Sequence, residues 1–143
     1  HVLYTIYMKK STAKEIAIDI LSRRDNSIRE MRMKLKQKKI SPEDIEETIL
    51  WLEGKKLLDD RVFAQKRAES IFRTKLVGPK FIQSKLRGAG IAGEISDEVL
   101  DELATPEEWG ERAQKAIEQW QRIHPKHAED RVRKMRFLAS RGF

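Results

Sequence analysis

The chain has 143 residues, of which 37% are charged and 7% aromatic, with seven glycines, four prolines and no cysteine. This composition is typical of helical proteins with long solvated faces, and it argues against a β-sandwich, a β-barrel or a collagen-like chain. The absence of cysteine excludes disulfides and thiolate metal sites. Lys and Arg outnumber Asp and Glu by 30 to 23, and the resulting net charge of +7 favours an anionic partner.

Residues 1–10 contain the only strand-like stretch, an apolar run from Val2 to Met8 that Thr5 interrupts. The run is far shorter than the roughly 20 residues of a membrane-spanning helix. It also lacks the basic start and the cleavage site of a signal peptide. We interpret residues 1–10 as an N-terminal strand-like arm or a vector-derived remnant. We expect a soluble, cytoplasmic protein without membrane contact.

An internal repeat organises the remainder of the chain. A shift of about 51 residues superposes the apolar positions of the first half on those of the second; Ala17, Ile20, Leu35 and Ile40 coincide with Ala68, Ile71, Leu86 and Ile91. A further shift of 52 residues brings Leu86 and Ile91 onto Leu138 and Phe143, although Lys134 replaces an apolar residue. Self-similarity at such a period is the sequence signature of a repeat architecture.

The sequence predicts two or three helices in each repeat, described here in chain order. Repeat 1 (11–57) predicts three helices, the second capped by Ser27 and the third opened by Ser41 and Pro42. Repeat 2 (58–104) follows the same pattern, with Gly78-Pro79 opening its second helix. Partial repeat 3 (105–143) predicts two helices, whose apolar residues are Trp109, Ala113, Ala116, Ile117 and Trp120, then Val132, Met135 and Leu138.

These patterns predict an all-α fold of tandem three-helix repeats, in which the third repeat is truncated. A three-helix unit of this size buries little apolar surface alone, so neighbouring repeats must stack. We therefore expect an elongated, curved array, and we expect it to be a monomer.

Charge is sorted between the helices of each repeat. The three second helices, within residues 27–39, 79–90 and 128–141, carry net charges of +5, +3 and +3. The third helices carry −5 in residues 42–53 and −5 in residues 94–103. We expect the second helices to form a basic stripe that contacts a partner or DNA. Its candidate contact residues are Arg29, Arg32, Lys36, Lys80, Lys85, Arg87, Arg133 and Arg136.

No set of residues in the sequence has the types and spacing of a catalytic site. We therefore expect that the protein is not an enzyme and binds no cofactor. His124 and His127 have metal-ligand spacing, but Pro125 lies between them, so we predict no metal site. The paired carboxylates at Asp59-Asp60 and Glu107-Glu108 stand at helix starts, where the helix dipole explains them. The three tryptophans have helical spacing beside apolar residues, which favours packing over base stacking.

Two segments resemble the RecX family of recombination regulators: Leu57-Leu58-Asp59-Asp60-Arg61-Val62-Phe63-Ala64, and residues 78–91 from Gly78-Pro79-Lys80 to Gly90-Ile91. Arg23-Arg24-Asp25-Asn26-Ser27 and Ser140-Arg141-Gly142-Phe143 are similar to the same family. The resemblance implies a bacterial protein that binds the RecA filament on single-stranded DNA. It also implies restraint of ATP hydrolysis, strand exchange and coprotease activity, with weak single- or double-stranded DNA contact.

Two other hypotheses stay open at the level of sequence. The first is a helical DNA-binding protein that acts independently of the recombinase, using its second helices for recognition. Such binding weakens steeply with salt, because it rests on phosphate neutralisation. The second is a structural scaffold whose basic face is merely solvated, which predicts binding to neither the filament nor DNA.

Overall fold

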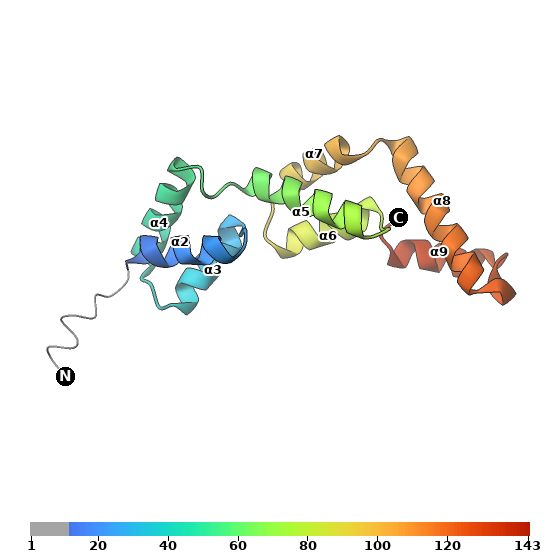
Figure 1. Ribbon diagram of the computed structural model, residues 1–143, viewed down its shortest axis with the longest axis horizontal. Helices are drawn as coiled ribbons and strands as arrows, with labels where there is room; N and C mark the ends of the chain where they lie inside the picture. Colours follow the sequence, from blue (N-terminus) through green and yellow to red (C-terminus); the bar gives the residue numbers. More distant parts are fainter. Residues whose placement is uncertain (1–11) are drawn as a thin grey trace, which may run out of the picture. The chain divides into compact units, whose positions relative to one another are not determined.

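The computed structural model describes residues 12–143, which contain eight α-helices, a single 3-10 helix and no strand (Figure 1). The expected all-α fold of tandem three-helix repeats is confirmed. The described residues divide into two compact units, unit 1 up to Asp59 and unit 2 from Asp60 to Phe143. The predicted arm at residues 1–10 lies outside the described residues, and the curved array stays a prediction.

Unit 1 contains α2 (Ala13–Arg23), α3 (Ile28–Gln37) and α4 (Pro42–Gly54), which pack on one another (Figure 1). Their shared core buries Ala17, Ile20, Met31, Leu35, Ile45, Ile49, Leu52 and Leu58. The hydroxyls of Thr12, Ser27 and Ser41 each accept a hydrogen bond from a backbone N–H of the first turn. Each helix therefore starts at a side chain that satisfies an otherwise unpaired N–H group.

The first three helices of unit 2 repeat this arrangement. They are α5 (Asp60–Thr74), α6 (Pro79–Gly88) and α7 (Gly93–Leu103), and α7 packs on both α5 and α6. Their core buries Phe63, Ala64, Ala68, Ile71, Val77, Ile82, Leu86, Ile91, Val99 and Leu100. Ala17, Ile20 and Leu35 and their counterparts Ala68, Ile71 and Leu86 are thus buried in both cores, while Ile40 is partly buried against the first core and its counterpart Ile91 is buried in the second.

The remainder of unit 2 is a helical pair. It comprises α8 (Pro106–Ile123), the 3-10 helix η1 (Pro125–His127) and α9 (Arg131–Ser140), with α9 packed along α8 (Figure 1). Among the apolar residues of this pair, only Ala116 is fully buried. Val132 and Met135 are 59% and 60% exposed, so their predicted place on the inner face of α9 is wrong. Leu138 is half-buried, in agreement with the prediction, and so is Phe137, whose ring stacks on Trp120 of α8.

All three second helices end in the same backbone turn. Lys39, Gly90 and Gly142 have φ values of 61°, 84° and 84°. The next residue in each case donates its N–H to the carbonyl of Leu35, Leu86 or Leu138, over 3.2, 3.0 and 3.0 Å. This is the Schellman closure of a helix C-terminus. The third repeat is therefore recognisable in the backbone, even where its apolar pattern is weak.

Candidate functional site

The candidate contact residues on unit 1 lie on α3. Arg29, Arg32 and Lys36 are three, four and seven positions apart, which places them along one side of the helix. Arg32 is already engaged, because its Nε and Nη2 donate to the two Glu46 carboxylate oxygens of α4 at 2.8 and 3.2 Å. These hydrogen bonds hold the pKa of the Glu46 carboxyl below its usual value. Much of the Arg32 charge is therefore matched within the repeat, whereas Lys36 forms no ion pair within residues 12–143.

The candidate residues on unit 2 lie on α6 and α9. On α6, Lys80, Lys85 and Arg87 are exposed, and the Lys85 ammonium stands 5.4 Å from the centroid of the Phe81 ring. On α9, Arg133 pairs with Asp130 at 3.2 Å, while Arg136 is exposed. Neither Lys80, Lys85 nor Arg136 forms an ion pair with any residue from 12 to 143. Their charges are thus available to an outside partner.

The end of α9 meets the start of α6 within unit 2 (Figure 1). The Gly78 N–H donates to the carbonyl of Arg141 at 2.7 Å, and the Lys80 N–H donates to the carbonyl of Gly142 at 3.0 Å. These carbonyls satisfy two N–H groups at the start of α6, whose N-cap residue has no side chain to do so. The end of α9 is therefore anchored at the start of α6.

Two glycines make this approach possible. A Cβ on Gly78 would collide with the Gly142 carbonyl and stand 2.7 Å from the Phe143 nitrogen. A Cβ on Gly142 would collide with the backbone of Phe81, and Gly142 also has a φ of 84°. Both glycines lie in the segments that carry the family resemblance, so the structure supplies a physical reason for them.

Arg112 is an interaction residue that the sequence analysis missed. From α8, its Nη2 donates to the carbonyls of Phe72, Lys75 and Val77 at 3.1, 2.7 and 3.4 Å. Its guanidinium also lies 3.8 Å from the Phe72 ring centroid, and burial lowers its pKa. Phe72 lies in the last turn of α5, and Lys75 and Val77 follow it, so the guanidinium lies at the C-terminal end of this helix, where a cation is favourable. No repeat position signals this role, because it depends on where α8 lies.

The tryptophans pack against other side chains, as predicted. Trp51 adjoins the unit 1 core, and the Trp109 ring meets Phe72 edge-on at a centroid distance of 5.4 Å. Trp120 stacks on Phe137 at 6.0 Å. Within residues 12–143 no three His, Asp or Glu side chains gather as possible metal ligands. Over the same residues, no helix is long and apolar enough to cross a membrane.

Comparisons with known proteins point to one family. The model of the first three-helix domain of RecX matches residues 13–52, and that of the second three-helix domain of RecX matches residues 59–100. The regulatory protein RecX of Herbaspirillum seropedicae is 34% identical over 130 residues, which are 91% of this chain and 82% of that protein. The regulatory protein RecX of Chlorobaculum tepidum is 32% identical over 136 residues, covering 94% and 82% of the two chains.

Solved structures have the same fold. The crystal structure of RecX from Lactobacillus salivarius matches with a TM-score of 0.84 at 23% identity, covering 92% of this chain and 86% of that one. A second crystal structure, of a regulatory protein RecX, matches with a TM-score of 0.79 at 27% identity and covers 92% and 65%. The relatives carry the name of a regulatory protein and not that of an enzyme.

Proposed function

The chain belongs to the RecX family, and we propose that it binds the RecA filament on single-stranded DNA in the cytoplasm. There it regulates the filament, mainly by inhibiting ATP hydrolysis, strand exchange and coprotease activity. The family assignment supports the regulatory role, and the exposed basic surface supports an anionic partner. The chain acts as a monomer in this proposal, with DNA contact secondary to filament contact.

The observation that carries the proposal is the unpaired charge on the second helices. Among the candidate contact residues, Lys36, Lys80, Lys85 and Arg136 form no ion pair within residues 12–143. An exposed cation keeps most of its hydration until a partner carboxylate or phosphate approaches, so these residues contribute most to complementarity with an acidic surface. Arg32 and Arg133 contribute less, because Glu46 and Asp130 already balance their charge.

The direct test measures DNA-dependent ATP hydrolysis by a bacterial RecA while this protein is titrated in. We expect strong inhibition at less than one copy per recombinase subunit. The triple variant Lys36→Glu, Lys80→Glu, Arg136→Glu should require at least about tenfold more protein, a loss of roughly 1.4 kcal/mol in binding. Full inhibition by this variant at the original concentration would contradict the basic-surface proposal.

A matched control separates position from total charge. The variant Arg67→Glu, Lys115→Glu, Lys126→Glu makes the same change in net charge at exposed residues outside the second helices. This control variant should inhibit ATP hydrolysis as strongly as the unaltered protein. An equal loss of inhibition in both triple variants would show that only the net charge matters, and not the position of the cations. Absence of inhibition, together with oligothymidylate binding that falls steeply between 50 and 200 mM salt, would favour a DNA-binding protein that acts independently.

A further inference from the structure

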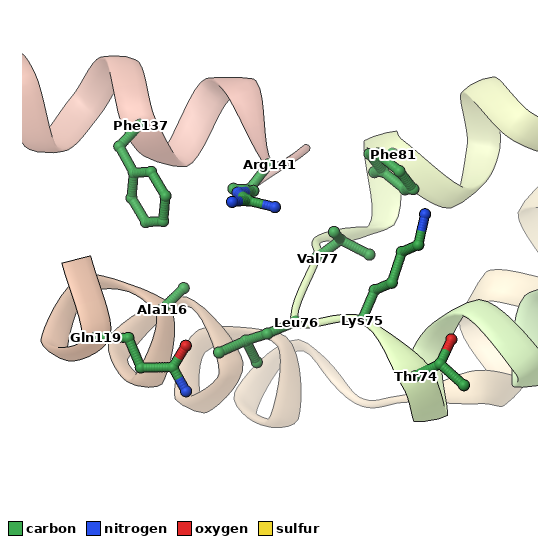
Figure 2. A pocket seen from close by; sticks show the side chains of 9 residues that line it. All are labelled: Thr74, Lys75, Leu76, Val77, Phe81, Ala116, Gln119, Phe137 and Arg141. Atoms are coloured by element: carbon green, nitrogen blue, oxygen red, sulfur yellow. The ribbon is translucent and has the colours of Figure 1, made fainter. Parts of the chain in front are cut away.

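A cavity of 460 Å³ lies between the second and third repeats of unit 2 (Figure 2). Its walls come from the end of α5 and the segment that follows, from the start of α6, and from the facing sides of α8 and α9. None of the candidate contact residues lines this cavity, and neither the repeat pattern nor the family resemblance assigns it a role.

The lining combines two cations with an apolar floor. Lys75 and Arg141 are its charged residues, and no Asp or Glu is among its members. Figure 2 shows the Arg141 guanidinium above Leu76 and beside Val77, with Phe137 and Ala116 on the other side of the hollow. The Arg141 guanidinium forms no ion pair within residues 12–143 and lies 5.6 Å from the centroid of the Phe137 ring. The cavity therefore offers positive charge beside apolar surface.

Two sets of hydrogen bonds hold the walls in place before any ligand binds. On one side, Arg112 fixes the carbonyls of Lys75 and Val77. On the other side, the Gly78 N–H fixes the carbonyl of Arg141. A preformed site of this kind loses little conformational entropy on binding, which favours measurable affinity for a short ligand.

We propose that this cavity binds an acidic peptide segment that carries one large apolar side chain. The peptide carboxylate pairs with Arg141 and Lys75, while the apolar side chain lies against Leu76, Val77 and Phe137. This inference does not depend on the recombinase, so it can fail without affecting the proposed function, and the reverse also holds.

A peptide suits the cavity better than a nucleic acid does. Both aromatic rings of the lining already have partners: Lys75 and Lys85 approach Phe81, while Trp120 stacks on Phe137 and Arg141 approaches it. Base recognition on single strands relies on aromatic faces that are open to stacking. Leu76, Val77 and Ala116 add aliphatic surface to the lining, which matches an aliphatic or aromatic side chain.

The test uses the full chain, labelled with 15N, and the fluorescein-tagged peptide Gly-Asp-Leu-Asp-Phe-Glu-Asp-Gly. Backbone amides of Leu76, Ala116 and Gln119 should shift in heteronuclear NMR spectra during the titration. One control peptide replaces Asp and Glu by Asn and Gln, and the other replaces Leu and Phe by Ser. Both controls should bind at least about tenfold more weakly by fluorescence anisotropy. If the serine peptide bound as tightly as the original peptide, charge alone would explain the affinity, and the proposal would be overturned.

Arg141→Gln tests the site directly, and Arg131→Gln is its matched control, because Arg131 is exposed at the start of α9 and does not line the cavity. The Arg141 side chain can be changed without loss of the α6 anchor, because only its backbone carbonyl accepts from Gly78. Peptide affinity should fall about fivefold or more in Arg141→Gln and stay unchanged in Arg131→Gln. Equal losses in the two variants would overturn the proposal. So would an oligothymidylate that shifts the cavity amides more strongly than the peptide does.

Discussion

The starts of α3 and α6 occupy equivalent places in the first and second repeats, yet different parts of the chain satisfy them. In α3 the Ser27 hydroxyl accepts from the Glu30 N–H and the Glu30 carboxylate accepts from the Ser27 N–H, both at 3.1 Å. In α6 the cap residue is Gly78, and the acceptors are carbonyls of Arg141 and Gly142. The same requirement for hydrogen-bond acceptors is thus met locally in one repeat and by a distant segment in the other.

The ends of these helices show a smaller contrast. Both close with a residue in the left-handed region, but this residue is Lys39 after α3 and Gly90 after α6. A side chain in that conformation costs about 1 kcal/mol or more, whereas glycine adopts it freely. The first repeat therefore has the better helix start and the more strained helix end. Exchanges between equivalent positions can test each difference.

The largest effect is expected from giving α6 the cap residue that α3 has. Gly78→Ser introduces a better N-cap residue type, yet it should destabilise unit 2 by about 2–3 kcal/mol. The reason is that its Cβ would collide with the Gly142 backbone and displace the end of α9. Urea unfolding can be followed by tryptophan fluorescence, since Trp109 and Trp120 both lie in unit 2.

Gly110→Ala is the matched control for this exchange. Its Cβ would meet nothing within 4 Å, and alanine is favoured over glycine inside a helix, so we expect stabilisation of up to about 1 kcal/mol. If Gly78→Ser raised the stability as well, the serine would be capping α6 without a clash. The end of α9 would then not be anchored at Gly78.

The next effect concerns the local cap of α3. Ser27→Ala removes the hydroxyl that accepts from the Glu30 N–H, and we expect a loss of about 1 kcal/mol in the stability of unit 1. Hydrogen exchange of the α3 amides should speed up accordingly, while exchange in α6 stays unchanged. Equal acceleration in both helices would show that the cap does not act locally.

A stabilising exchange is expected at the helix ends. Lys39→Gly should raise the stability of unit 1 by about 0.5–1 kcal/mol, because relief of the left-handed conformation outweighs the greater freedom of glycine in the unfolded chain. The reverse exchange, Gly90→Lys, should lower the stability of unit 2 by a similar amount. Thermal unfolding of both variants provides the measurement, and a loss of stability in Lys39→Gly would contradict the turn geometry.

The smallest effect concerns two equivalent polar pairs. Arg32 and Glu46 form an ion pair in the first repeat, and Gln83 donates to Asp97 at 3.3 Å in the second. Because the folded-state pKa of Glu46 is lowered, its stabilising contribution is present above the ordinary glutamate pKa of about 4.3. That contribution is lost as the pH falls through the lowered value.

Substituting Arg32 should remove this pH dependence. In Arg32→Gln the pKa of Glu46 should rise toward the ordinary range, as followed by NMR titration of the carboxyl carbon. Gln83→Ala should leave the pKa of Glu46 unaltered. An unchanged pKa in Arg32→Gln would show that the pair does not persist in solution.

Sequence reasoning identified the helices and the charged surfaces better than it identified their partners. The 51-residue period revealed the buried positions of both cores, since repeated burial leaves a repeated apolar pattern. It could not show that Arg32 and Arg133 are paired with acids, because Glu46 and Asp130 are no different in sequence from other carboxylates. The apolar type of Leu50 in α4 also does not reveal that its side chain is 70% exposed, while its neighbour Ile49 is buried.

The sequence alone determined the all-α class, the repeat and the sorting of charge between helices. These properties follow from local periodicity and composition, which hold whatever the helices pack against. Only the tertiary structure decided the roles of Gly78, Gly142 and Arg112, and the existence of the cavity between the second and third repeats. Each of these depends on segments about 35 to 60 residues apart that meet in space. Such contacts leave no local pattern, because a backbone carbonyl can accept from any donor that the fold brings near.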